Sequence, residues 1–454
     1  MEERRKSISL AGGSLDCDKA SLAGAVSQRA CVYCGARVVL NPITDAFHLV
    51  HGPIGCASYT WDIRGSLSAG SELYRQSFST DLRERDIVFG GEAKLRAGLR
   101  EIAEIYRPPV IFIYATCVVG VIGDDVEAVA REAEKAYGIR VIVIQSPGFA
   151  GHKSLGYRLA GEALMKLLSP QADPASQPQA RQPQARQPKV RGLNILGDYN
   201  LAGEMWIIKN YYREIGLPVI ASFTGDSTCA ELRKAPTAAL NVVQCAGSMT
   251  YLAKRLEEEY GIPWIKASFF GLEDTARALR ETVDLLGSAE ERSRAEALIA
   301  RESRRAEAAI KPYLPGLKGK KAAIFVGGGF KAISLIRQFR ALGLETVLVG
   351  TQTGQKEEYE VMANLASPGT VILDDANPSE LEAFMREKGA DILVGGVKER
   401  PLAYKLGVAF CDHNHERQAP LAGFVGVENF TREIDLTINS PVWSYVQAAG
   451  VTLS

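Results

Sequence analysis

The sequence has no excess of charge of either sign and no long run of apolar residues. Its 53 lysines and arginines balance 53 aspartates and glutamates, so neither a polyanion nor a membrane surface is indicated as a partner. No stretch approaches the roughly 20 apolar residues that span a bilayer, and the N-terminus lacks a charged segment followed by an apolar run. We therefore expect a protein of the cytoplasm.

The length and composition are typical of a globular protein with several domains. At 454 residues the chain has room for about three domains of roughly 150 residues each. The hydrophobic fraction of 46% and the charged fraction of 23% are those of a chain that buries a large apolar core.

Disulfide bonds are not expected, because the cytoplasm keeps thiols reduced. Metal ligation, catalysis and plain burial remain as roles for the cysteines. The eight cysteines are Cys17, Cys31, Cys34, Cys56, Cys117, Cys229, Cys245 and Cys411.

Three of these thiols lie in turn or strand-end contexts. Cys31 precedes a strand-like run, Cys56 follows a Gly-Pro-Ile-Gly turn, and Cys117 follows an apolar strand. Thiolates on short turns are the usual protein ligands of iron–sulfur clusters. Cys34 forms a CxxC pair with Cys31, so either all four thiols bind a four-iron cluster or a partner chain supplies one ligand. The spacing alone leaves a zinc site, a redox site and buried free cysteines open.

Strand-like runs alternate with helical patterns along the chain, which predicts an α/β fold of three Rossmann-like open parallel-sheet domains. The first part has expected strands at 38–40, 110–115 and 141–144, and helices at 95–106, 125–136 and 161–168. The second has strands at 193–196, 219–223, 239–243 and 264–269, and helices at 202–215, 249–260 and 288–310. The third has strands at 322–326, 346–349, 371–373 and 392–394, a helix at 332–342 and another that starts at Asn377 and Pro378.

Composition sets the expected domain boundaries. Residues 169–191 are rich in proline, glutamine and arginine, with a repeated Gln-Pro-Gln-Ala-Arg unit, and predict a linker or surface loop. The predicted domains are therefore residues 19–168, 192–317 and 318–454, preceded by an N-terminal arm over residues 1–18.

Two further places combine reactive side chains with a strand end. Cys245 follows a strand, and a helix begins just after it, so that the helix N-terminus favours an anionic thiolate or ligand. A small buried residue is the alternative. Cys411, His413, Asn414 and His415 follow another strand, where they would either bind a metal or cap the neighbouring backbone.

Five separated motifs, taken together, resemble the nitrogenase component 1 superfamily. They occur in the family's order from about Cys31 to the C-terminus, and the resemblance fails over the proline-rich linker. Within the family the chain most resembles the alpha-type subunits of the scaffold that assembles the iron–molybdenum cofactor. The motifs are HLVHGPIGCASYTWDIRGSLSAGSELYRQSFSTDLRERDIVFGG, YATCVVGVIGDD, LGDYNLAGEMW, VVQCAGSMTYLAKRLEEEYGIPW and FCDHNHERQAPLAGFVG.

The resemblance implies a fold, a partner and two metal sites. Family members have three parallel-sheet domains and pair with a homologous beta-type subunit as a heterotetramer. Cys31, Cys56 and Cys117 match the alpha-side ligands of a cluster shared across the subunit interface, of the [4Fe-4S] or P-cluster-like type, to which the beta subunit adds the missing thiolate. Cys245 matches the cysteine that holds the larger cofactor or its eight-iron precursor. Cys34 is an addition with no role implied.

Departures from the family pattern favour a scaffold. Dinitrogen-reducing subunits carry a histidine ligand where this chain has Ala422, and a Gln-Ser-Leu-Gly-His-His segment where it has Tyr157 and Arg158. The second cofactor ligand and the proton-donating imidazole are thus both absent. A cluster held by fewer ligands leaves more readily, which suits a protein that receives a precursor and passes it on.

The remaining assignments are hypotheses. Asn414 or His415 would make a second contact to the large cluster, and Arg64 and Lys153 would offset its negative charge. No catalytic residue is assigned. The implied partners, besides the beta-type subunit, are a reductase iron protein, a cluster-donating maturase and apo-nitrogenase as the acceptor. The alternatives are a nitrogenase-like reductase of the methylthio-alkane type and an iron–sulfur electron-transfer or structural subunit.

Overall fold

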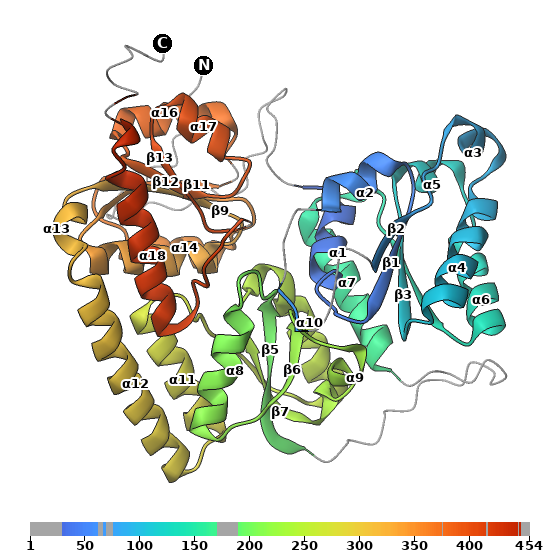
Figure 1. Cartoon of the computed structure of the whole chain (residues 1–454), viewed down its shortest axis with the longest axis horizontal. Helices are drawn as coiled ribbons and strands as arrows, with labels where there is room; N and C mark the ends of the chain where they lie inside the picture. The colour runs from blue at the N-terminus through green and yellow to red at the C-terminus, as the bar shows by residue number, and fades with distance from the viewer. Residues whose placement is uncertain are drawn as a thin grey trace. The chain divides into compact units, whose positions relative to one another are not determined.

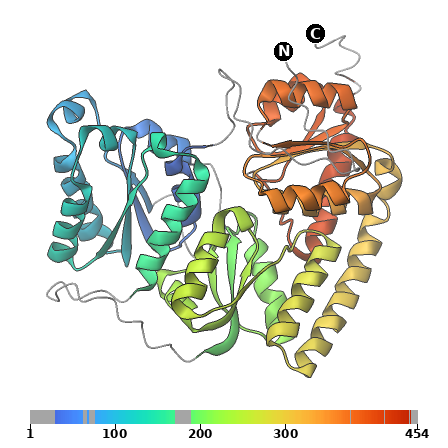
Figure 2. The same cartoon turned by 180° about the vertical axis from the view of Figure 1, so that it is seen from behind.

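The computed structural model describes residues 30–61, 67–69, 76–169, 189–374, 376–414, 416–443 and 445 (Figures 1 and 2). The predicted N-terminal arm and nearly all of the predicted linker lie outside these residues, as do Cys17, Arg64 and His415. The chain divides into an amino-terminal unit, Ala30–Lys266, and a carboxy-terminal unit that begins at Ala267. We describe each unit by itself.

The amino-terminal unit begins with a four-stranded parallel sheet in the order β2-β1-β3-β4. Its strands are β1 (Ala46–His51), β2 (Ser77–Ser79), β3 (Val110–Ala115) and β4 (Arg140–Gln145). The helices are α1 (Val32–Leu40), α2 (Ile54–Trp61), α3 (Glu84–Phe89), α4 (Glu92–Tyr106), α5 (Cys117–Ile122), α6 (Val126–Tyr137) and α7 (Lys153–Leu168). Every residue of β3 is buried, as expected for a strand covered on both faces.

Alternation along β3 separates the two faces of this sheet. Ile111 and Ile113 pack with residues of α4 and α6, whereas Phe112 and Tyr114 pack with residues of α1 and α7. The sheet is therefore the middle layer between two pairs of helices.

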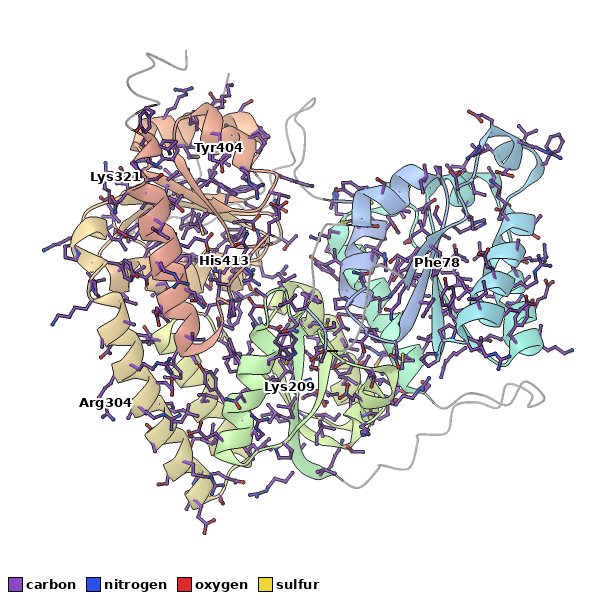
Figure 3. The ribbon with its side chains drawn as sticks, viewed as in Figure 1. Phe78, Lys209, Arg304, Lys321, Tyr404 and His413 are labelled. Carbon is purple, nitrogen blue, oxygen red and sulfur yellow. The ribbon has the colours of Figure 1, made fainter. Side chains whose placement is uncertain are left out.

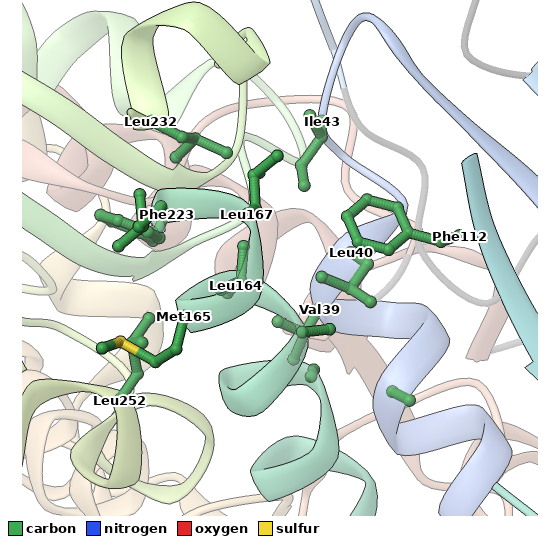
Figure 4. Close-up of a cluster of buried hydrophobic side chains, with 14 of the residues drawn as sticks. Val39, Leu40, Ile43, Phe112, Leu164, Met165, Leu167, Phe223, Leu232 and Leu252 are labelled. Atoms are coloured by element: carbon green, nitrogen blue, oxygen red, sulfur yellow. The ribbon is translucent and has the colours of Figure 1, made fainter. Parts of the chain in front are cut away.

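A second parallel sheet in the same unit has the order β6-β5-β7-β8. Its strands are β5 (Val190–Asp198), β6 (Val219–Thr224), β7 (Ala238–Val243) and β8 (Trp264–Lys266), with helices α8 (Glu204–Ile215), α9 (Cys229–Leu232) and α10 (Ala246–Tyr260). One apolar core joins the two sheets through α1, α7 and α10, and its labelled side chains include Val39, Leu164 and Phe223 (Figure 4).

The carboxy-terminal unit has a five-stranded parallel sheet in the order β11-β10-β9-β12-β13. The strands are β9 (Lys321–Val326), β10 (Glu345–Thr351), β11 (Val371–Asp374), β12 (Ile392–Gly395) and β13 (Ala409–Asp412). The helices are α11 (Leu272–Leu286), α12 (Ala289–Ile310), α13 (Leu314–Leu317), α14 (Gly329–Leu342), α15 (Lys356–Leu365), α16 (Pro378–Lys388), α17 (Arg400–Lys405) and α18 (Gly423–Ile438). The expected α/β fold of three open parallel sheets is confirmed.

The expectation of a strand at 38–40 is wrong, because these residues form the last turn of α1. The run Val-Val-Leu suits a strand by propensity, but every residue of α1 is buried, and packing against α7 overrides a weak local preference. By contrast, the helix start at Asn377 is confirmed, since the Asn377 side chain accepts hydrogen bonds from the backbone of Ser379 and Glu380.

The long charged helix α12 is amphipathic. An apolar stripe that includes Leu298 and Ile299 is buried within its own unit, and α12 packs against α11 and α18. Arg304 belongs to the exposed face (Figure 3). None of the described helices has an apolar stretch long enough to cross a bilayer.

Glu399 makes the stability of the carboxy-terminal sheet depend on pH. Its carboxylate is buried and accepts a 2.9 Å hydrogen bond from the Gly396 backbone, and burial raises its pKa from 4.5 to about 7. An acid with a raised folded-state pKa stabilises the fold below its unfolded pKa and loses that contribution as the pH rises to the folded pKa. We expect β12 and α17 to lose up to about 3 kcal/mol of opening free energy between about pH 4.5 and 7.

Hydrogen exchange of the β12 and α17 amides across this pH range, corrected for intrinsic rates, measures the effect. Glu399→Gln should flatten the dependence, whereas the exposed Glu357→Gln should leave it unchanged. A wild-type profile without slope would contradict the assignment.

Candidate metal-cluster sites

Cys31, Cys56 and Cys117 each lie at the start of a helix that follows an irregular segment or a strand end. Cys31 is the N-cap of α1, Cys56 lies in the first turn of α2, and Cys117 is the first residue of α5, two residues after β3. Backbone N–H groups in first turns have no partner within the helix and favour negative charge nearby. All three positions therefore suit thiolates.

The structure brings these three thiols near one another, with Cys31 and Cys117 beside Gly148. The backbone N–H of Gly148 donates a 3.0 Å hydrogen bond to Cys117 Sγ. A methyl group at Gly148 would lie 3.0 Å from Cys117 Sγ, which is a tight contact, and 3.6 Å from Cys31 Sγ, so glycine leaves more room beside the sulfurs. Burial, and then the neighbouring thiols of Cys117 and Cys31, raise the pKa of Cys56.

A close crossing of α1 and α7 sets the position of Cys31. A Cβ atom at Gly35 would lie 2.1 Å from the Lys153 carbonyl oxygen, and one at Gly156 would lie 2.0 Å from the Val32 carbonyl oxygen. The two backbones are therefore in direct contact one turn inside each helix. Cys31, at the start of α1, forms a β-bridge with His152, the N-cap of α7.

Buried hydrogen bonds hold the strand ends that lead to Cys56 and Cys117. His51 Nδ1 lies 3.0 Å from Thr80 Oγ1 and its Nε2 lies 3.0 Å from Asp124 Oδ2, while Thr116 Oγ1 donates a 3.0 Å hydrogen bond to the His51 carbonyl. Burial lowers the pKa of His51, although Asp124 opposes the shift. His51 thus acts as a structural connector between β1, β3 and the following loops.

Arg37, in the last turn of α1, places a positive charge in the core of the amino-terminal unit. It is 3% exposed, its guanidinium lies 5.5 Å from the Tyr114 ring centre, and its Nε and Nη1 have no hydrogen-bond partner among the described residues. Burial raises the pKa of Tyr33 to about 12. Arg37 lowers this pKa and Cys56 raises it, so both residues lie within electrostatic reach of the Tyr33 ring. A buried cation is costly unless an anion compensates it.

These residues fit an anionic iron–sulfur cluster. Converging sulfurs, an N–H donor to one of them and a buried cation are features that such a cluster uses. Within the described ranges, no three or more His, Cys, Asp or Glu side chains are grouped so that they could hold a single metal ion. Thiolates that bind different irons of one cluster stand further apart than the ligands of one ion.

Cys34 lies one turn into α1. It is 1% exposed and belongs to a small buried cluster with Ala30 and Val38, against which the partly buried Cys31 packs. The two cysteines of the CxxC motif are therefore also close in space. Cys31 belongs to the group of three converging thiols, and Cys34 belongs to the buried cluster against which Cys31 packs.

Cys245 is the N-cap of α10, two residues after β7, as the strand-then-helix pattern predicts. It is partly exposed, and its carbonyl accepts a 3.0 Å hydrogen bond from the Met249 backbone. The preceding Gln244 donates a 3.0 Å hydrogen bond to Asp198 Oδ2 at the end of β5. The thiol thus lies at the carboxyl edge of the second sheet, where ligands bind in open α/β folds.

Lys153 lies at the same end of a helix pair as Cys245. Helices α7 and α10 pack side by side and run in the same direction. Arg158 lies over the ring of Tyr251, and one turn further along both helices Glu162 pairs with Arg255. The first turns of the two helices, which carry Lys153 and Cys245, therefore lie at the same end of the pair. Lys153 Nζ itself lies 5.9 Å from the Tyr157 ring centre.

In the carboxy-terminal unit, Asn414 accepts a 3.2 Å hydrogen bond from Lys331 Nζ, and its backbone N–H donates to Asp412. His413 is fully buried against Phe270 and Phe430, and burial lowers its pKa well below the usual value (Figure 3). The loop thus shows backbone capping, and it buries an imidazole that the sequence pattern treats as a candidate ligand. Cys411 is also buried, with its thiol 3.4 Å from Glu433 Oε1.

Residues 31–439 match the family model described as nitrogenase component 1 type oxidoreductase. The chain belongs to this family. It is similar to the nitrogenase iron-molybdenum cofactor biosynthesis protein NifE of Clostridium pasteurianum, with 62% identity over 96% of this chain and 92% of the relative. The NifE protein of Methanosarcina barkeri is 53% identical over 95% and 93% of the two chains. A solved structure titled "Nitrogenase Cp1 at pH 5" superimposes with a TM-score of 0.84 at 30% identity, covering 95% and 92% of the chains.

The structure locates the two departures from the pattern of the dinitrogen-reducing members of this family. Ala422 is the N-cap of α18, is fully buried and forms a β-bridge with Phe270. Its methyl group has no donor atom for a metal. Tyr157 is 8% exposed, and Arg158 lies with its guanidinium 5.2 Å from the Tyr251 ring centre. Both residues of α7 therefore contribute to packing between helices.

Proposed function

We propose that this chain is the alpha-type scaffold subunit on which the nitrogenase iron–molybdenum cofactor is assembled and matured. The observation that carries the proposal is its identity of 62%, over nearly its whole length, to a relative named as a cofactor biosynthesis protein. Ala422, at the position where the resemblance places a metal-binding histidine, supports a scaffold over a turnover enzyme.

In this proposal Cys31, Cys56 and Cys117 hold a [4Fe-4S] or P-cluster-like cluster at the interface with a homologous beta-type subunit, which adds a thiolate and completes a heterotetramer. When bound, such a cluster supplies one-electron transfer. The residues of this chain position the three sulfurs on helix starts, donate the Gly148 N–H to Cys117 and counter the negative charge with Arg37.

The cargo is an eight-iron precursor cluster, which Cys245 grips at the edge of the second sheet. Lys153, at the same end of the helix pair, offsets part of its negative charge, and Arg64 adds to this. By the resemblance to the family, we also propose Asn414 or His415 as a weak second contact to the cargo. Because Ala422 offers no ligand, the cargo has one strong protein bond to break, which suits receipt from a maturase, reduction by an iron protein and release to apo-nitrogenase.

Transfer of the cargo tests the function. The purified heterotetramer, loaded with precursor, is mixed under reducing conditions with cofactor-free nitrogenase, and nitrogenase activity is measured after the two are separated. Activation of the acceptor supports the scaffold. No transfer, together with turnover of a small substrate driven by an iron protein and ATP, would favour a nitrogenase-like reductase of the methylthio-alkane type.

Cys56→Ala should remove the iron of the interface cluster, because one of the three converging sulfurs is lost. It should also reduce the fraction of heterotetramer, because the proposed cluster links the two subunits. Iron analysis and size-exclusion chromatography measure the two effects. The buried Cys411→Ala, which removes a thiol from the other unit, is the control. An unchanged iron content in Cys56→Ala would refute the ligand assignment.

A further inference from the structure

Among the residues that the structure describes, Cys34 is the one thiol near the three converging cysteines that the proposed cluster does not use. It is buried within α1, and Cys31 packs against the small cluster to which it belongs. The two residues are the N-cap and the third residue of the helix, since Val32 is the first. The Gly35 N–H donates a 3.1 Å hydrogen bond to the Cys31 carbonyl, so the turn that separates the two cysteines is regular.

This geometry suits a disulfide. Residues three apart in a helical turn have Cα atoms about 5 Å apart, within the roughly 4.4–6.8 Å that a disulfide spans. Side chains on a helix tilt toward its N-terminus, which directs Cys34 toward Cys31. Cys31 itself has an extended backbone with φ of −73° and ψ of 172°, and it is the more exposed of the two.

We propose that Cys31 and Cys34 form a reversible disulfide in the chain that carries no interface cluster, and that this bond must be reduced before the cluster can be built. The proposal rests on the proposed role of Cys31 as a cluster ligand. The proposed disulfide gives a function to Cys34, the cysteine that the three expected ligands do not include. The disulfide with Cys34 protects the partly exposed Cys31 thiol from irreversible oxidation until iron is bound.

The oxidant is a small-molecule disulfide such as oxidised glutathione. The Cys31 thiolate attacks one of its sulfurs, which forms a mixed disulfide and releases one glutathione thiolate. The Cys34 thiolate then attacks the Cys31 sulfur, which closes the ring and releases the second. The two protein thiols lose two protons and two electrons, and oxidised glutathione becomes two thiols. A bound iron at Cys31 blocks the first step.

Trypsin makes the test direct, because cleavage after Arg29 and Arg37 releases the peptide ACVYCGAR, which contains both cysteines and no others. The full-length chain is stripped of iron, treated with oxidised glutathione, alkylated and digested. We expect this peptide to lose two hydrogens and to take up no alkylating reagent. In the cluster-loaded heterotetramer the same peptide should be fully alkylated after denaturation.

Two variants separate the pair from a general reaction of thiols. In Cys34→Ala, and in Cys34→Ser, the peptide should stop at a stable glutathione adduct on Cys31, because the second thiol is missing. Cys229→Ala, which removes a buried thiol of the same unit, should behave as the wild type. A wild-type peptide that ends as the adduct, or that stays reduced while the variants react, would overturn the disulfide.

Iron uptake tests the gate. The oxidised wild-type chain, combined with its partner subunit, should bind no interface-cluster iron from ferrous ions and sulfide until a thiol reductant is added. Full uptake while the disulfide persists would overturn the gate. If the reduced chain and its partner also bind no iron, the ligand role of Cys31 fails instead, and disulfide formation in the peptide is unaffected by that result.

Discussion

Replacing Cys245 with alanine should yield a heterotetramer that keeps the iron of the interface cluster and loses all iron of the precursor cluster. Cys245 is partly exposed at the N-cap of α10, and its backbone carbonyl, not its thiol, accepts the first hydrogen bond of that helix. The fold should therefore survive the change. In the proposed scaffold, the Cys245 sulfur is the strong attachment of the cargo to this chain.

Iron analysis and the spectra of the two clusters measure the result, and transfer to cofactor-free nitrogenase should fall to background. Cys229→Ala is the matched control, since it removes a fully buried thiol from the same unit. Ser248→Ala is a second control, because it removes a hydroxyl one turn into α10 that accepts a 2.7 Å hydrogen bond from Tyr199. Retention of both clusters in Cys245→Ala would refute the assignment.

Substituting alanine for Gly156 should destabilise the amino-terminal unit and abolish the interface cluster together. The added methyl group would lie 2.0 Å from the Val32 carbonyl oxygen and 2.6 Å from the Ala36 backbone nitrogen, neither of which can move without the whole of α1. Overpacking a tight core costs about 1–3 kcal/mol, and displacing a helix backbone belongs at or above the upper end of that range. Because Cys31 begins α1, its sulfur would move away from Cys117.

Urea unfolding followed by circular dichroism, with iron content measured in parallel, tests this expectation. Gly35→Ala should have a similar effect, since its methyl group would meet the Lys153 carbonyl from the other side of the crossing. Gly98→Ala on α4 is the matched control, because its methyl group would make only ordinary 3.6 Å contacts with Leu49, and alanine favours a helix. If Gly156→Ala unfolds at the wild-type midpoint and retains its iron, the crossing does not set the site.

The individual strands were largely predictable, because parallel strands that are buried on both faces have short, continuous apolar sequences. The run at 110–115 and the run at 322–326 both lie in observed strands. The run at 38–40 has the same local appearance and is helical, because it belongs to a segment whose partner, α7, follows more than a hundred residues later in the sequence. The local secondary-structure preference of a segment carries no information about such a distant contact.

The sequence by itself determined the alternation of strands and helices, the three parallel sheets and the positions of Cys117 and Cys245 just after a strand, since these follow from periodicity and turn residues. It did not predict that Cys31 and Cys56 lie at helix starts. Only the tertiary structure decided that Cys31, Cys56 and Cys117 come near one another, that Cys31 packs against the small buried cluster around Cys34, and that His413 is buried among aromatic rings. Their proximity depends on how α1 packs against α7 and how strand ends align in a sheet. Such distances join residues far apart in the chain, and no local pattern of side chains specifies them.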